Sequence, residues 1–201
     1  MIEIPTDLPA DLVPLSWLLG VWEGTGVIDY EASGHHFTGE FAHRVSFSHD
    51  GGDFLNYSAG AWLLGDGEAR TPLVAETGFW RLARPSADHD PGPGLLPAMV
   101  EASAPRTADD VETLRNADGG FDIEVSLVHS DGVSELYLGQ VKGPRIDLAT
   151  DAVVRTAGAK HYAAATRLFG LVDAHLLWAW DIAALGGELA SHASARLARA
   201  E

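Results

Sequence analysis

Apolar and polar residues alternate over short stretches from residue 20 onward, and turn-forming residues separate the stretches. Phe121–Ser130 shows the pattern most clearly, because every second residue from Phe121 to Leu127 is apolar. Asp50-Gly51-Gly52-Asp53 is typical of a hairpin turn. The pattern predicts strands at Trp22–Tyr30, Phe37–Ser48, Phe54–Leu64, Leu73–Ala83, Phe121–Ser130, Val133–Val141, Arg145–Leu148, Val153–Thr156, Tyr162–Leu171 and His175–Ile182.

About ten short strands, most of them adjacent in sequence, favour an up-and-down meander. With few helices, they predict an all-β fold, a closed antiparallel β-barrel with one or two short helical turns. A β-sandwich is the alternative, because counting strands does not distinguish closure from stacking. At 201 residues, we expect a single domain over residues 1–201.

Three segments lack the strand pattern. Residues 1–14 are interpreted as a lead-in packed on the outside, followed by a helical turn at Leu15–Leu19. Residues 84–120 are rich in proline and glycine and predict a surface insertion, in which Leu95–Ala104 forms a strand or a short helix. The Ala-rich Ala183–Glu201 is consistent with either a final strand or a terminal helix, because helix propensity and barrel closure favour different structures.

The composition of the chain narrows the range of functions that it could have. Hydrophobic residues make up 46% and charged residues 21%, as in ordinary globular proteins. The formal charge of −16 argues against nucleic acids and anionic membranes as partners. The absence of cysteine excludes disulfides, thiolate nucleophiles and Cys-ligated metals. Without a long apolar run or a basic leader, we expect a soluble, cytoplasmic protein. We expect its partners to be small molecules, and a homodimer is the assembly we consider.

Gly20, Trp22, Gly24 and Gly26 share one face of the first predicted strand. Their spacing differs from that of a dinucleotide-binding loop, and they enter a strand instead of a helix. Three positions without side chains beside one large aromatic residue suit a crowded barrel end. We therefore interpret Trp22 as a residue that fills that end.

Histidine is the remaining route to a metal or haem. We expect His43 and His175 on either face of their strands. His192 is distinctive because alanines and serines surround it, which leaves room for a flat, bulky ligand against the imidazole. The others are expected to be solvated or are given no role: His35, His36, His49, His89, His129 and His161.

The N-terminal sequence Leu15-Ser16-Trp17-Leu18-Leu19-Gly20-Val21-Trp22-Glu23-Gly24-Thr25-Gly26 resembles the G-x-W-x-G-x-G motif of the nitrobindins, also named peroxynitrite isomerases. The members of this family are haem-binding β-barrels, and their fold is similar to that of the lipocalins and fatty-acid-binding proteins. Further similarity lies in Val45–Gly51, Glu76–Arg81, Leu127–Glu135, Ala159-Lys160 and Leu189–Leu197, so that the resemblance covers nearly everything except residues 84–120.

The resemblance implies a ten-stranded barrel with one ferric haem b per chain. It implies that His192 is the axial iron ligand, with its other ring nitrogen held by a hydrogen bond, and that Lys160 pairs with a haem propionate. It implies that the glycine–tryptophan motif supports the haem end. The implied reaction is isomerisation of peroxynitrite to nitrate, and nitric oxide is a further implied ligand.

Two alternatives stay open. A non-enzymatic, lipocalin-like carrier of a fatty acid or another apolar molecule would hold the carboxylate with a buried arginine, for which Arg44, Arg81 and Arg155 are candidates. A barrel that serves only as an interaction module would contain no pocket.

Overall fold

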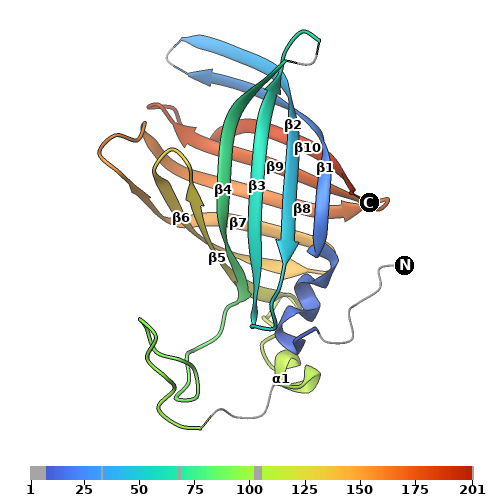
Figure 1. The fold of residues 1–201 in the computed structure, drawn as a ribbon, viewed down its shortest axis with the longest axis vertical. Helices are drawn as coiled ribbons and strands as arrows, with labels where there is room; N and C mark the ends of the chain where they lie inside the picture. The colour runs from blue at the N-terminus through green and yellow to red at the C-terminus, as the bar shows by residue number, and fades with distance from the viewer. Residues whose placement is uncertain (1–7, 33, 68, 102–105, 201) are drawn as a thin grey trace.

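The computed structural model describes residues 8–32, 34–67, 69–101 and 106–200, and within these residues ten strands close into one antiparallel barrel (Figure 1). Each strand pairs with the next one along the chain, and the last pairs with the first. The strands are β1 Gly20–Ala32, β2 His35–Ser48, β3 Phe54–Leu64, β4 Arg70–Leu82, β5 Phe121–His129, β6 Val133–Lys142, β7 Arg145–Arg155, β8 Tyr162–Val172, β9 His175–Ala184 and β10 Ala190–Arg199.

The predicted all-β barrel is confirmed, and the sandwich alternative was wrong. The open question about the C-terminal segment is settled in favour of a strand, because β10 supplies hydrogen bonds to β9 on one side and to β1 on the other. The predicted strands Arg145–Leu148 and Val153–Thr156 both fall in the single strand β7, except for Thr156, which follows its end. Asp151 is an extra residue in β7, opposite Leu136 and Tyr137 of β6. This bulge interrupts the alternation of apolar and polar residues, which is why the pattern divided one strand into two.

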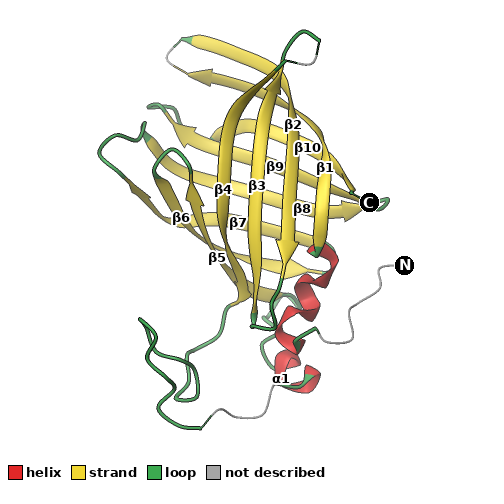
Figure 2. Ribbon diagram, viewed as in Figure 1, coloured by secondary structure: helices red, strands yellow, loops and turns green. Residues whose placement is uncertain are grey.

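One end of the barrel is covered by a 3₁₀ helix, η1 Ala10–Leu18, which lies beside the short α1 Ala108–Glu112 (Figure 2). Leu12, Leu15 and Leu18 are fully buried. Residues 10–14, expected to form a lead-in packed on the outside, are the first part of η1 and pack over this end of the barrel. Residues 1–7 lie outside the described part of the chain. Neither described helix is long and apolar enough to cross a membrane.

The segment after β4 leaves the barrel at the same end (Figure 1). Arg84 anchors its start, with Nη1 2.6 Å from Asp90 and Nη2 3.0 Å from Asp53. Where Leu95–Ala104 was expected to form a strand or helix, the residues up to Glu101 have neither. Residues 102–104 lie outside the described residues.

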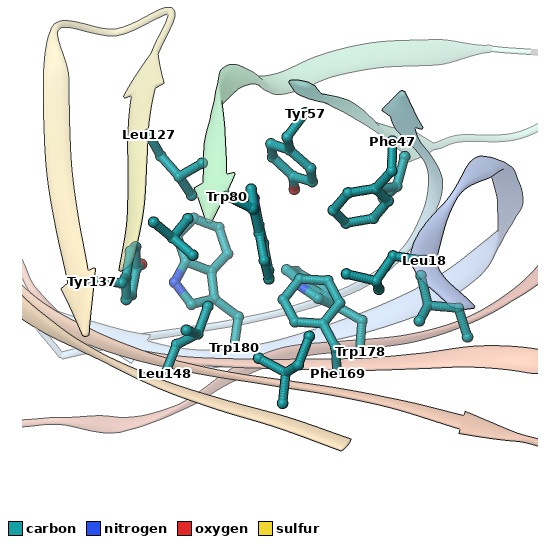
Figure 3. Close-up of a cluster of buried hydrophobic side chains, with 14 of the residues drawn as sticks. Leu18, Phe47, Tyr57, Trp80, Leu127, Tyr137, Leu148, Phe169, Trp178 and Trp180 are labelled. Atoms are coloured by element: carbon teal, nitrogen blue, oxygen red, sulfur yellow. The ribbon is translucent and has the colours of Figure 1, made fainter. Parts of the chain in front are cut away.

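Aromatic side chains fill the half of the interior next to η1 (Figure 3). The ring of Phe47 lies 5.1 Å from Tyr57 and 5.3 Å from Trp80, and Trp80 lies 5.2 Å from Phe169. Trp22 fills this end as predicted, and its Nε1 donates a hydrogen bond to the Leu18 carbonyl at 2.7 Å. This packed half leaves the opposite half available for a cavity.

Candidate functional site

A cavity of about 310 Å³ occupies the half of the barrel away from η1. Its walls are mainly apolar, and the polar groups that face it include His43, His129 and His192. This composition is typical of small-ligand sites. A larger hollow of about 660 Å³ lies over mainly outward-facing residues of β5–β9, including Asp122, Asp147 and Asp181. We place the site inside the barrel because the interior cavity is the more apolar and enclosed of the two.

His192 faces this cavity because of a β-bulge. Ala193, Ala195 and Leu197 are the inward residues of β10, so strict alternation would turn residue 192 outward. The pairing with β9 shifts by one residue between Ser191 and Ala193, which makes His192 the extra residue. A bulge can re-aim a side chain beside a functional site.

Two aromatic rings fix the imidazole of His192. The Tyr30 ring lies 4.9 Å away at 89°, and the Trp180 ring lies 5.5 Å away at 80°. Burial lowers the pKa of His192, which favours the neutral imidazole. Among the described residues, its buried Nδ1 has no hydrogen-bond partner, so the expected hydrogen bond on the second ring nitrogen is absent. The side chain is thus held by packing alone.

His43 also lines the cavity and is buried. Its Nδ1 lies 3.1 Å from the Gly60 carbonyl, an acceptor that requires a proton on Nδ1 and leaves a lone pair on Nε2. Burial lowers the pKa of His43. Its ring lies 4.8 Å from the ring of Trp178. Because the lowered pKa favours the neutral form, His43 is a second neutral imidazole, deeper in the cavity.

A cluster of buried charges separates the cavity from the packed half. The Arg167 guanidinium on β8 binds both carboxylate oxygens of Glu76 on β4, at 2.6 and 2.8 Å. Tyr57 donates a hydrogen bond to the same carboxylate. Burial alone would raise the pKa of Glu76, but the Arg167 guanidinium and its hydrogen bonds lower that pKa to about 2. Glu76 is therefore a buried carboxylate anion.

The same cluster includes Glu135 on β6. Its carboxylate accepts a hydrogen bond from Tyr137 at 2.7 Å and lies 2.6 Å from Nε2 of His129 on β5. Burial would raise the pKa of Glu135, whereas the His129 hydrogen bond and the Arg167 charge lower it. Glu135 is thus a second buried carboxylate with polar partners on its two oxygens.

His129 was expected to be solvated, and this expectation was wrong, because only 6% of its surface is exposed. The strand pattern held the signal that could have located it. His129 has the same parity as Phe121, Ile123, Val125 and Leu127, all of which point inward. Glu76, Glu135 and Arg167 likewise occupy inward positions of their strands. Polar residues in phase with the apolar face therefore marked this cluster.

Comparison with known proteins gives the family. The model described as "THAP4-like, heme-binding beta-barrel domain" matches residues 11–199. The chain belongs to this family. A protein of Leifsonia xyli named peroxynitrite isomerase is 67% identical over 204 residues, covering 100% of both chains. One of the same name in Clavibacter michiganensis is 64% identical over 201 residues, again over 100% of both.

A solved barrel has the same fold. The crystal structure of Rv2717c from M. tuberculosis superposes with a TM-score of 0.67 at 25% sequence identity, covering 99% of this chain and 100% of that one. The resemblance of the sequence to the nitrobindins and the ten-stranded barrel it implied are both confirmed.

In this haem-binding barrel, the structure does not bring all the predicted residues together. Lys160 is exposed in the loop between β7 and β8, and only its carbonyl makes a hydrogen bond, from Arg155. That loop lies at the same end as His192, because Tyr162, two residues later, lines the cavity. The ammonium group of Lys160 does not line the cavity itself.

The glycine–tryptophan motif runs from the η1 end toward the cavity. Trp22 pairs with Arg199 of β10, seven positions from His192, so Trp22 supports the packed end and not the surroundings of His192. A Cβ on Gly24 would lie 2.2 Å from the Arg196 carbonyl, and one on Gly26 would lie 2.6 Å from the Phe41 ring. Phe41 lines the cavity. Gly26 is therefore the member of the motif that shapes the cavity wall. Gly20 has a φ of +115°, a conformation that favours glycine.

The arginines expected in a fatty-acid carrier point away from the interior. Arg44 pairs with Glu23 and Arg81 with Glu124, both on the outer surface, and Arg155 is exposed. The buried guanidinium is that of Arg167, which Glu76 already occupies. A ligand carboxylate would have to displace Glu76, so this arrangement disfavours the carrier.

The residues of the cavity fit a haem group. An imidazole whose buried Nδ1 makes no hydrogen bond within the described residues, and whose lowered pKa favours the neutral form, is suited to bind iron. Trp178, Trp180 and Ile182 provide apolar walls beside it. A metal ion without a haem ring needs several protein ligands. The described residues contain no group of three His, Asp or Glu side chains placed to hold such an ion.

Proposed function

We propose that the protein binds one haem b per chain through His192 and isomerises peroxynitrite to nitrate. The observation that carries the proposal is the bulge in β10 that turns His192 into an apolar cavity. Membership of a heme-binding family and strong similarity to proteins named peroxynitrite isomerase support it. When bound, the haem would supply a Lewis-acidic, one-electron iron centre for the rearrangement of peroxynitrite to nitrate.

The residues of this chain hold and shelter the cofactor. His192 would hold the haem iron through a ring nitrogen, and Tyr30 and Trp180 fix the plane of its ring. The apolar walls of the cavity exclude water from the side of the bound ligand that faces them. Lys160 lies in a loop at the same end of the barrel, where its ammonium would reach a propionate at the protein surface. Nitric oxide, a small neutral ligand of haem iron, would bind at the same centre.

The reaction can be tested by stopped-flow absorbance of peroxynitrite with haemin-loaded protein, followed by measurement of nitrate and nitrite. We expect faster decay than with the cofactor-free protein and a higher proportion of nitrate. His192→Ala should lose the acceleration, whereas His175→Ala, on the half-buried residue that begins β9 at the η1 end, should retain it. Equal decay with loaded and cofactor-free protein would contradict the proposed activity.

A further inference from the structure

The loop between β7 and β8, residues 156–161, begins at the edge of the cavity. The Thr156 N–H donates a hydrogen bond to the Gly132 carbonyl at 3.0 Å, which ties the loop to the turn between β5 and β6. Asp131 and Val133, on either side of that glycine, both line the cavity. The start of the loop is therefore fixed beside the cavity and not beside the packed half.

The other end of this loop is tied to the turn that precedes His192. The Leu185 N–H donates to the His161 carbonyl at 2.9 Å, and the Gly186 N–H donates to the His161 Nδ1 at 3.4 Å. Leu185 and Gly186 lie between β9 and β10, and His192 is the third residue of β10. Tyr162, which directly follows the loop, lines the cavity together with His192. The loop thus runs along the edge of the cavity from one turn to the other.

Two cationic side chains lie on this stretch of the chain. Arg155 is the last residue of β7, where it pairs with Val133, and Lys160 belongs to the loop itself. The Arg155 Nη1 donates a hydrogen bond to the Lys160 carbonyl at 3.1 Å, so the guanidinium lies against the backbone of Lys160. This contact leaves Nε and Nη2 of Arg155 available. Arg81 binds Glu124 with the same two nitrogens, which form an edge suited to a carboxylate.

In the part of the chain that the structure describes, neither cation is paired with a carboxylate. The chain has 29 acidic and 13 basic residues, and other exposed arginines, such as Arg44 and Arg145, do form such pairs. The Asp131 carboxylate, which also lies at this edge, accepts the Val133 N–H at 3.3 Å. Two positive charges at the edge of the cavity are therefore available to an anionic ligand.

We propose that Arg155 is a second carboxylate-binding residue at the edge of the cavity, and that it acts with Lys160 on a ligand with two carboxylates. The ligand class is a dicarboxylic porphyrin. Haem b carries two propionates, of which Lys160 holds one in the proposed function, and Arg155 binds the other through Nε and Nη2. The inference rests on the proposed function for the porphyrin, but it depends neither on iron nor on His192.

The test uses the cofactor-free protein and metal-free protoporphyrin IX, which has both propionates but cannot form a bond from iron to His192. Its dimethyl ester has the same ring without the charges. We expect the diacid to bind about tenfold more tightly than the diester at low ionic strength, and the difference to narrow in about 0.5 M NaCl. Porphyrin fluorescence measures both affinities. Equal affinities, or no binding of the diacid, would overturn the proposal.

Matched variants then assign the preference to named residues. Arg155→Ala and Lys160→Ala should each weaken binding of the diacid by about threefold, leave the diester unchanged, and together remove the preference. Lys142→Ala is the control, because it removes the same charge from an exposed residue at the opposite end of β6 from Val133. Equal weakening of the diester in Arg155→Ala, or an equal effect of Lys142→Ala on the diacid, would overturn the role of Arg155.

A fatty acid offers the same carboxylate chemistry with one charge instead of two. Laurate should not displace the bound diacid when the two are present at equal concentration. Displacement would show that one carboxylate and an apolar chain suffice, and it would overturn the porphyrin as the ligand of Arg155 and Lys160.

These results and the proposed function can fail separately. Binding of the metal-free diacid through Arg155, without a Soret band from haemin, would remove iron ligation by His192 and leave the carboxylate-binding pair. A Soret band that depends on His192, with no preference for the diacid, would remove only the role of Arg155.

Discussion

Tyr30 and His192 lie edge to face at the cavity, with ring centroids 4.9 Å apart and ring planes at 89°. The Tyr30 hydroxyl reaches across β10 to Ala184 at the end of β9, donating to its carbonyl at 3.1 Å and accepting from its N–H at 3.3 Å. Tyr30 thereby ties β1 to the hairpin that precedes His192. Packing holds the imidazole at its bulge, and the two hydrogen bonds tie the Tyr30 side chain to Ala184.

Tyr30→Phe should separate the two contributions. The variant keeps the ring against His192 and loses both hydrogen bonds to Ala184. We expect the free energy of unfolding, measured by urea titration, to fall by about 1–2 kcal/mol while haemin affinity changes little. Tyr30→Ala removes the ring as well and should weaken haemin binding. Equal haemin affinity in Tyr30→Ala would show that the ring does not position His192.

Gly24→Ala tests the close approach of β1 to β10. The added Cβ would lie 2.2 Å from the backbone oxygen of Arg196, which cannot move without distorting the strand pair. We expect a loss of about 1–3 kcal/mol in thermal or urea unfolding. Gly158→Ala is the control, because nothing lies within 4 Å of its Cβ position. Similar stability of the two variants would contradict the crowding.

The Glu76–Arg167 pair predicts acid sensitivity. The pKa of Glu76 falls from an ordinary 4.5 to about 2 in the folded protein. A carboxyl group with a lowered folded pKa stabilises the protein above its unfolded pKa, and this stabilisation is lost as the pH falls from about 4.5 toward 2. The shift corresponds to roughly 3 kcal/mol. Urea unfolding over this pH range should show the loss.

Glu76→Gln should remove most of that pH dependence and lower stability at neutral pH by about 3–5 kcal/mol, since Arg167 loses its bidentate partner. The matched surface variant is Glu124→Gln, which breaks the exposed pair with Arg81 and should cost less than about 1 kcal/mol. If Glu76→Gln cost no more than Glu124→Gln, the buried pair would not contribute as described.

The sequence predicted the strands and the closed barrel because alternation is a local property that a buried face imposes on each strand. Alternation also located the inward polar residues in principle, although His129 was assigned to solvent because it stands next to a turn. The pattern could not reveal the bulge that turns His192 inward, since a bulge depends on pairing between strands. Nor could it reveal that Glu76 and Arg167, which are far apart in sequence, meet across the interior.

The most direct test of the account is absorbance titration of haemin into the cofactor-free protein. The unaltered chain and His175→Ala should both develop a Soret band that saturates at one haemin per chain. His192→Gly should lose that band, and added imidazole should restore it by entering the space that the side chain leaves. An unchanged Soret band in His192→Gly without imidazole would show that iron has another ligand and would contradict the central claim.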